Sequence, residues 1–197
     1  MSTKQLILHP INPKASFDHL ELFTDQLQAV GFLGETFNLF GEIHYKPGDD
    51  FFDFITFESG HNIVILEGDS PNIKPGKVVD SRFACQIYVT EVSETEDIIV
   101  SSITNLGTCP NCQYEVENWP EVVSEWYKDR DSAFWQCLKC KKKFRAYELN
   151  WHRTAGFARY SIRIEQIYPE TAFPTKILLN LLRDITGEEW DYMYYWL

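Results

Sequence analysis

Four of the five cysteines in this 197-residue chain form two Cys-x-x-Cys pairs, "CPNC" at 109–112 and "CLKC" at 137–140. A spacing of two residues folds the backbone into a tight turn, so that both sulfur atoms of a pair reach one metal ion. Two such turns supply four thiolates, which is the tetrahedral ligand set of a structural zinc ion and leaves no open position for a catalytic water. The pairs therefore predict a structural zinc site with four ligands: Cys109, Cys112, Cys137 and Cys140.

Residues 107–146, which carry both pairs, resemble a zinc ribbon through these two motifs and through Pro110. Many ribbons have glycine after each pair. Gln113 and Lys141 stand there in this chain, and both residue types can enter the left-handed backbone conformation at some energetic cost. The 24 residues between the pairs, 113–136, form a long loop. Lengthening a loop from about 18 to 24 residues costs only about 0.3 kcal/mol, against about 10–16 kcal/mol for zinc binding.

Two other chemistries use cysteines in this pattern. Iron accepts the same four ligands, so the spacing leaves zinc and iron open. A redox role would need a thioredoxin-like strand–helix context around each pair, and the sequence lacks that context.

The span between the pairs contains three of the six tryptophans, Trp119, Trp126 and Trp135. A short helix is expected over 120–130, after Pro120. One interpretation is that the three rings form the small core of the module, because a zinc module has few other apolar residues to bury. The other is a protruding aromatic surface that binds a protein partner.

A basic segment follows the second pair, and Lys141, Lys143 and Arg145 are expected on one face of a strand. Such a segment suits phosphate binding. A zinc ion with four thiolates, however, carries a charge of 2 − 4 = −2, which nearby lysines offset. The whole chain has a formal net charge of −11, and residues 1–102 contribute 6 − 16 = −10 of it. This charge opposes binding to nucleic acid or to an anionic membrane and suits a basic protein partner.

The composition predicts a folded cytoplasmic protein, with 44% hydrophobic and 15% aromatic residues. The longest apolar runs, such as 62–66, are too short to cross a bilayer, and the N-terminal run is too short for a signal peptide. The fifth cysteine, Cys85, alternates with Phe83 and Ile87 on one face of an expected strand. This pattern predicts a buried free thiol rather than a nucleophile.

Candidates for an active site are Asp49, Asp50 and Asp53, with His44 or His61. "DDFFD" at 49–53 matches the spelling of a Mg²⁺ motif in prenyl-diphosphate synthases, but there the carboxylates project from helices, and here a turn into a strand is expected. The five histidines show no metal or triad spacing, and the sequence has no P-loop, dinucleotide fingerprint or nucleophile elbow. These observations favour a protein that is not an enzyme.

Hydrophobic periodicity predicts the elements that must position these residues. The expected helices are 16–34, 93–107 and 169–187, with Ser16, Ser93 and Pro174 near their starts and Gly31, Gly107 and Gly187 at their ends. The expected strands are 4–10, 82–90 and 189–197, with hairpins at 51–68 and at 146–152 with 157–167.

Strands paired as hairpins, with about three helices among them, indicate an α+β fold with a largely antiparallel sheet. Residues 1–106 and 147–197 are expected to form one α+β domain into which the zinc-ribbon module, 107–146, is inserted. The leading hypothesis for function is a zinc-binding adaptor that works through protein–protein interaction. An acidic inhibitor or immunity-type protein that covers a basic partner is the first alternative, and an enzyme with its site in the N-terminal half is the second.

Overall fold

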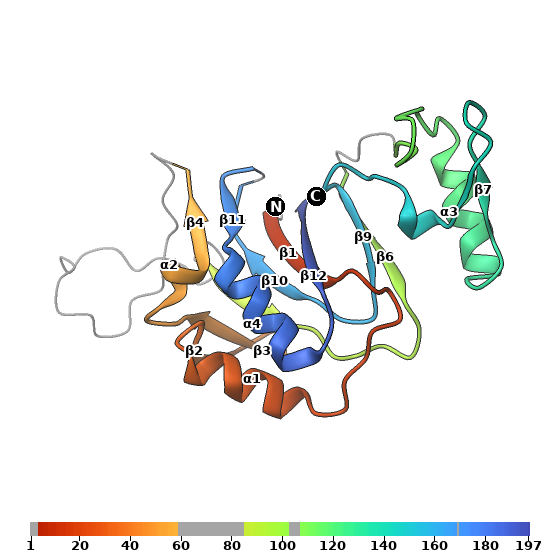
Figure 1. Ribbon diagram of the computed structural model, residues 1–197. Coiled ribbons are helices and arrows are strands. Elements are labelled where there is room, and N and C mark those ends of the chain that lie inside the picture. Colours follow the sequence, from red (N-terminus) through yellow and green to blue (C-terminus); the bar gives the residue numbers. More distant parts are fainter. Residues whose placement is uncertain (1–3, 59–84, 103–106, 169) are drawn as a thin grey trace.

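A computed structural model gives the structure of the chain and describes residues 4–58, 85–102, 107–168 and 170–197. Its centre is a six-stranded sheet in the order β12-β1-β10-β5-β3-β2 (Figure 1). Every neighbouring pair in this sheet is antiparallel, which confirms the predicted α+β class. The strands are β1 (Lys4–Pro10), β2 (Leu33–Leu39), β3 (Glu42–Pro47), β5 (Gln86–Val89), β10 (Ile162–Glu165) and β12 (Trp190–Trp196).

Three smaller antiparallel pairs and four α-helices complete the described part of the chain. The pairs join β4 (Ile55–Phe57) to β11 (Ala172–Pro174), β6 (Asp97–Val100) to β9 (Ala155–Ala158), and β7 (Trp135–Gln136) to β8 (Lys143–Phe144). The helices are α1 (Leu20–Ala29), α2 (Phe51–Phe54), α3 (Trp119–Lys128) and α4 (Lys176–Thr186), with a short 3-10 turn, η2, at Ala146–Glu148. None of the described helices is long and apolar enough to cross a membrane.

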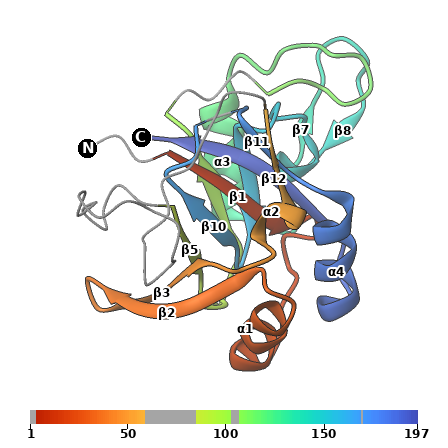
Figure 2. The same cartoon turned by 90° about the vertical axis from the view of Figure 1, so that its left-hand side faces the viewer.

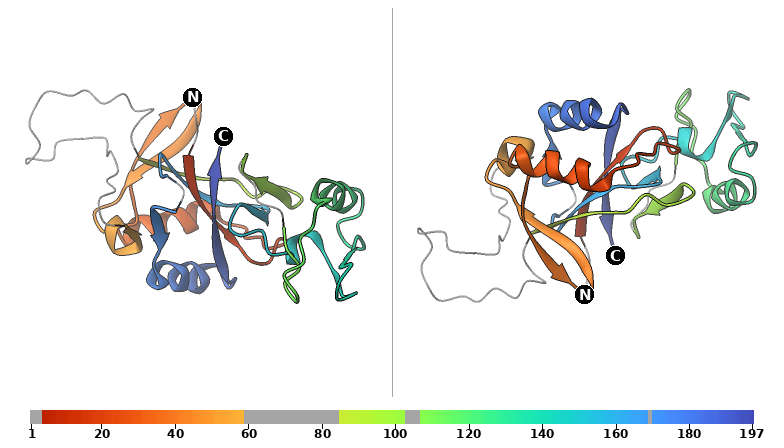
Figure 3. Two further views of the ribbon diagram at one scale, coloured as in Figure 1. Left: turned by 90° about the horizontal axis from the view of Figure 1, so that it is seen from above. Right: turned by 90° about the horizontal axis from the view of Figure 1, so that it is seen from below.

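The main hydrophobic core lies between the six-stranded sheet and the helices α1 and α4, which pack side by side (Figure 2). Leu6 and Ile164 from the sheet meet Leu27 and Leu182 from the helices, and all four are fully buried. A second core lies at the other end of the molecule, where α3 and η2 pack against β9 (Figure 3). The division of the chain into a domain and an inserted module stays a prediction.

The two helices that flank the main core, α1 and α4, end where the sequence predicted. α4 ends at Gly187, which has φ 74° as its position predicts, and α1 ends just before Gly31, with φ 73°. Their starts differ from the prediction. α1 begins at Leu20 rather than near Ser16, and the side chain of Thr175 caps α4 while Pro174 lies in β11.

Three sequence-based assignments are wrong. Residues 93–107 were expected to be a helix, but 97–100 form strand β6. The Ser93 hydroxyl donates to the carbonyl oxygens of Thr95 and Arg159 instead of capping a helix. The β-branched residues that follow pair with β9, so a tertiary contact overrides the local helical spacing.

The expected strand over 146–152 begins instead with a 3-10 turn at Ala146–Glu148. The expected strand over 157–167 is divided between β9 and β10, so the predicted hairpin is not formed. Residues 51–54 form the helix α2 rather than a strand. The second strand of the expected 51–68 hairpin lies outside the described residues.

Candidate functional site

The sulfur atoms of the four paired cysteines all lie within 4.8 Å of one another. Across the two turns, the Sγ–Sγ distance is 3.7 Å for Cys109 and Cys140 and 3.6 Å for Cys112 and Cys137. Four sulfur atoms at about 2.3 Å from a central ion are about 3.8 Å apart when the angles are tetrahedral. The fold therefore brings together the four residues that the sequence nominated, in a geometry that could hold a metal ion.

The two Cys-x-x-Cys turns have the same backbone hydrogen bonds. The N–H of Gln113 donates to the Cys109 carbonyl at 2.9 Å, and the N–H of Lys141 donates to the Cys137 carbonyl at the same distance. The N–H of each first cysteine donates in turn to the carbonyl five residues later, also at 2.9 Å. Gln113 and Lys141 have φ of 58° and 62°, the left-handed conformation expected of residues that replace glycine at this position.

The environment of the sulfur atoms favours the thiolate form at one of them. Burial raises the pKa of the Cys137 thiol, but hydrogen bonds from the backbone N–H groups of Cys140 and Lys139, together with the neighbouring thiols, lower it to about 6. Burial raises the pKa of Cys112 to about 11, and the adjacent thiols contribute to that rise. A metal cation is the partner that would allow all four sulfurs to lose their protons together, so the donor set could hold a metal ion.

The basic residues after the second pair do not share one strand face. Lys141 occupies the left-handed position of the turn, whereas Lys143 lies in β8. The guanidinium of Arg145 lies 5.3 Å from the ring centre of Phe134 and donates to the Tyr147 hydroxyl at 2.6 Å. The strand face of basic residues that the sequence suggested is therefore not formed.

The tryptophans between the two turns point mainly inward. Trp126 is fully buried in α3 and packs edge-on against Phe157 of β9, with ring centres 5.0 Å apart. Trp119 is partly buried and packs edge-on against Trp151 at 5.9 Å. These rings form a small core, as one of the two interpretations predicted, and that core extends beyond the module into β9.

The residues proposed for an active site in the N-terminal half do not converge. Asp49, Asp50 and Asp53 are exposed around the start of α2. His44 is buried in β3, where its ring stacks on Tyr88 with centres 5.0 Å apart. His61 lies outside the described residues.

The remaining cysteine behaves as the sequence predicted. Cys85 is a buried free thiol within the main core. Burial, with a smaller contribution from the Glu165 carboxylate, raises its pKa to about 12. A thiol this difficult to deprotonate is not a nucleophile at neutral pH.

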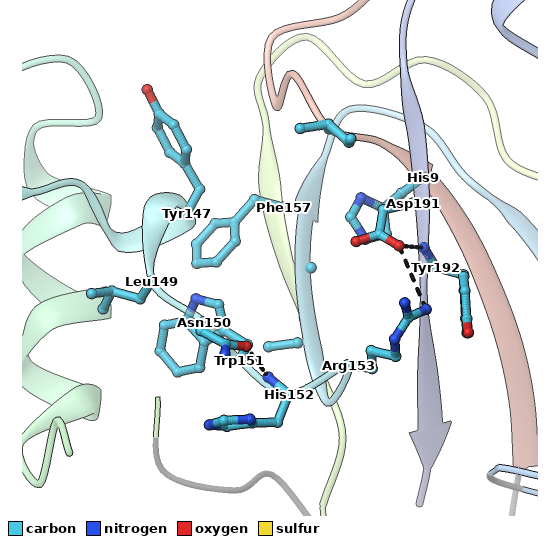
Figure 4. A pocket seen from close by; sticks show the side chains of 13 residues that line it. His9, Tyr147, Leu149, Asn150, Trp151, His152, Arg153, Phe157, Asp191 and Tyr192 are labelled. Atoms are coloured by element: carbon cyan, nitrogen blue, oxygen red, sulfur yellow. Dashed lines mark hydrogen bonds and ion pairs between the residues drawn. The ribbon is translucent and has the colours of Figure 1, made fainter. Parts of the chain in front are cut away.

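A cavity of about 290 Å³ was not indicated by the sequence (Figure 4). The pairing of β1 with β12 places His9 opposite Asp191, residues far apart in the chain. Asp191 accepts a hydrogen bond from the N–H of Tyr192 and lies 3.6 Å from a guanidinium nitrogen of Arg153, which stacks on the Tyr192 ring (Figure 4). Arg153 and Asp191 therefore form an ion pair within this cavity.

The turn that presents Arg153 is strained. The N–H of Thr154 donates to the Trp151 carbonyl at 3.0 Å, and the two residues between them, His152 and Arg153, have φ of 51° and 61°. Two consecutive left-handed positions are usually occupied by Asn and Gly. Contacts of Arg153 with Asp191 and Tyr192 hold this conformation in place of glycine.

Comparison with known proteins gave no match: no protein-family model, no curated protein and no solved structure is similar to this chain.

Proposed function

We propose that this chain binds one zinc ion through Cys109, Cys112, Cys137 and Cys140, and that the ion has a structural role. The observation that carries the proposal is the set of four sulfur atoms within 4.8 Å of one another, on two turns of matching backbone geometry. A zinc ion with four thiolates has no free position for water or substrate. Its contribution is to hold the two turns together.

Metal analysis of the purified full chain tests the zinc proposal. We expect one zinc ion per chain, and a loss of most of it in Cys112→Ser and Cys140→Ser, which remove half-buried ligands. Cys85→Ala is the matched control, because this cysteine lies in the main core, and it should retain one zinc ion. Iron in place of zinc, or equal zinc content in all three variants, would contradict the proposal.

We further propose that the protein acts by binding a protein partner in the cytoplasm rather than by catalysis. A site of four thiolates would be closed to water, and Asp49, Asp50 and Asp53 are exposed whereas His44 is buried in β3, which supports this proposal. Free cysteines are typical of a reducing compartment, and the described cysteines are all free. Exposed apolar side chains on the module, Phe134 and Leu138, are the natural contact points for a partner.

A pull-down from the native source tests the interaction role. Deleting 113–136 would remove Trp126 and the core around it, so a surface variant is the sharper probe. Phe134→Ser with Leu138→Ser should keep the zinc and lose the partner. Exposed apolar residues far from the module, Leu22 and Ile177, provide the control pair for the same substitution. If both double variants capture the same proteins as the unmodified chain, this surface is not the binding site.

A further inference from the structure

A second cavity, of about 370 Å³, lies where the end of α3 meets the strands β6, β9 and β10. Its walls include three arginines, Arg130, Arg159 and Arg163. Arg130 follows α3, Arg159 lies between β9 and β10, and Arg163 lies within β10. The chain has a formal net charge of −11, so the gathering of three guanidinium groups around one cavity is not a consequence of a basic surface.

In the described part of the chain, these three arginines have no carboxylate partner within 4.0 Å, and neither does Arg145, which donates to the Tyr147 hydroxyl instead. Arg153, by contrast, lies 3.6 Å from Asp191, and Arg183 lies 3.4 Å from Asp184 and 3.7 Å from Glu189. All three cavity arginines are only partly exposed. A guanidinium that is partly removed from water and lacks a counterion gains more from an anion than a fully solvated one does.

Hydrogen bonds hold the three guanidinium groups by one nitrogen each. The Nε–H of Arg159 donates to the Ser93 carbonyl at 2.7 Å, and that of Arg130 donates to the Glu96 carbonyl at 3.2 Å. The Nε–H of Arg163 reaches the Ser161 hydroxyl at 3.4 Å. Within the described residues, no hydrogen bond occupies their terminal nitrogens, which are the donors that form a fork on an oxyanion.

Two carboxylates also line the cavity, Glu91 and Asp97, and both are exposed. Asp97 is already engaged, because it accepts from the Tyr127 hydroxyl and from the N–H of Ile98. The charged residues that line the cavity therefore have a net charge of 3 − 2 = +1. The ring of Trp126 lies 5.2 Å from the Arg130 guanidinium and contributes to holding it in place.

We propose that this cavity binds a small molecule that carries a phosphate monoester. One arginine fork satisfies a carboxylate, whereas three guanidinium groups match the three terminal oxygens and the nearly double negative charge of a phosphate monoester. No cysteine lines this cavity, so the proposed ligand would not contact the proposed zinc ion.

Calorimetric titration of the full chain with phenyl phosphate tests the site, with benzoate as the carboxylate probe and phenol as the neutral one. Phenyl phosphate should bind saturably at one site, with benzoate at least tenfold weaker and phenol not binding. Arg163→Gln should weaken the binding of phenyl phosphate at least tenfold. Arg163→Lys keeps the charge but loses the fork, so its affinity should lie between those of Arg163→Gln and the unmodified chain.

Arg183→Gln is the matched control, because it removes the same charge from a residue outside the cavity. It should leave the affinity unchanged, and thermal melting should show that every variant remains folded. Equal weakening in Arg183→Gln and Arg163→Gln would show only general attraction and would overturn the proposal. So would benzoate binding as tightly as phenyl phosphate, or no saturable binding of phenyl phosphate to the unmodified chain.

Discussion

Gln113 and Lys141 occupy equivalent positions in the two Cys-x-x-Cys turns and share one backbone conformation, with φ of 58° and 62°. Each donates its N–H to the carbonyl of the first cysteine in its turn at 2.9 Å. The turn geometry therefore requires a left-handed residue at this position, whichever side chain the sequence supplies. A side chain with a Cβ atom is strained there, and glycine is not.

Lys141→Gly should raise the free energy of unfolding by about 1 kcal/mol, because relief of the left-handed strain exceeds the extra entropy lost by glycine on folding. Lys141 is the better of the two positions for this test, since the Gln113 side chain also accepts a hydrogen bond from the Thr108 hydroxyl. Chemical denaturation of the metal-bound protein measures the change.

The control for this substitution lies two residues earlier. Lys139 is exposed in the same turn and is not among the residues with positive φ. Lys139→Gly should therefore destabilise the protein by about 0.5–1 kcal/mol, through backbone entropy alone. If both glycine variants change stability in the same direction, the strain at position 141 does not govern the turn.

Gly156→Ala should destabilise the protein by about 1–3 kcal/mol through overpacking. A Cβ atom at this position in β9 would lie 2.6 Å from Nε2 of His9, closer than any normal contact. The imidazole is held by a hydrogen bond between Nδ1 and the Pro10 carbonyl, so it cannot move away freely.

A double-mutant cycle separates this clash from any other effect of the alanine. His9→Ala combined with Gly156→Ala should cost at least about 1 kcal/mol less than the sum of the two single changes. Additive costs in thermal or chemical denaturation would mean that the added methyl group is accommodated elsewhere.

His9 also predicts part of the pH dependence of stability. Burial lowers the pKa of its imidazole below 6.5, against smaller opposing effects of the Pro10 carbonyl and the Asp191 carboxylate. The folded state then binds fewer protons than the unfolded state. The contribution of His9 to the free energy of unfolding is fully present above pH 6.5. It is lost as the pH falls from there toward the folded-state pKa, by at most about 1.4 kcal/mol per pH unit.

The measurement compares the unmodified chain with His9→Gln at pH 7.5 and pH 5.5. The free energy of unfolding should fall less in the variant over this interval, because the titrating group is gone. Since both proteins carry the same cysteines, any loss of metal at the lower pH affects them equally. An identical fall in both proteins would exclude His9 as a contributor.

Trp126→Ala should destabilise the protein by about 3–5 kcal/mol, the range for removing a large buried ring. Trp126→Phe should cost much less than alanine. The Trp126 Nε1–H is buried with no hydrogen-bond partner in the described structure, so phenylalanine removes an unsatisfied donor while keeping most of the ring. Urea denaturation of both variants checks the order, and equal costs would contradict it.

The cysteine cluster was predictable because each Cys-x-x-Cys turn is a local structure. Its hydrogen bonds and its left-handed residue lie within six positions of the chain. The end of α4 was predictable for the same reason, since Gly187 supplies the left-handed conformation at which the helix stops.

The helix expected over 93–107 failed because Ile98 and Val100 alternate as in a strand and pack against the second core, and pairing with β9 favours the strand. The cavities could not be predicted at all. His9 meets Asp191 only through the register of β1 and β12, and Arg130 joins Arg159 and Arg163 only once α3 has packed against β6 and β9. Charge totals along the sequence conceal such clusters, because they carry no information about which residues meet.

The pairing of β6 with β9 also has a kinetic consequence. Val100 lies opposite Ala155, so this ladder cannot close until the 54 residues from 101 to 154 have been brought together. If a metal ion already holds Cys109 next to Cys140, the loop that must close contains only the 8 residues 101–108 and the 14 residues 141–154. The entropy of closing the shorter loop is smaller by about 0.8 kcal/mol, so a chain that captures its ion early should form this ladder about fourfold faster.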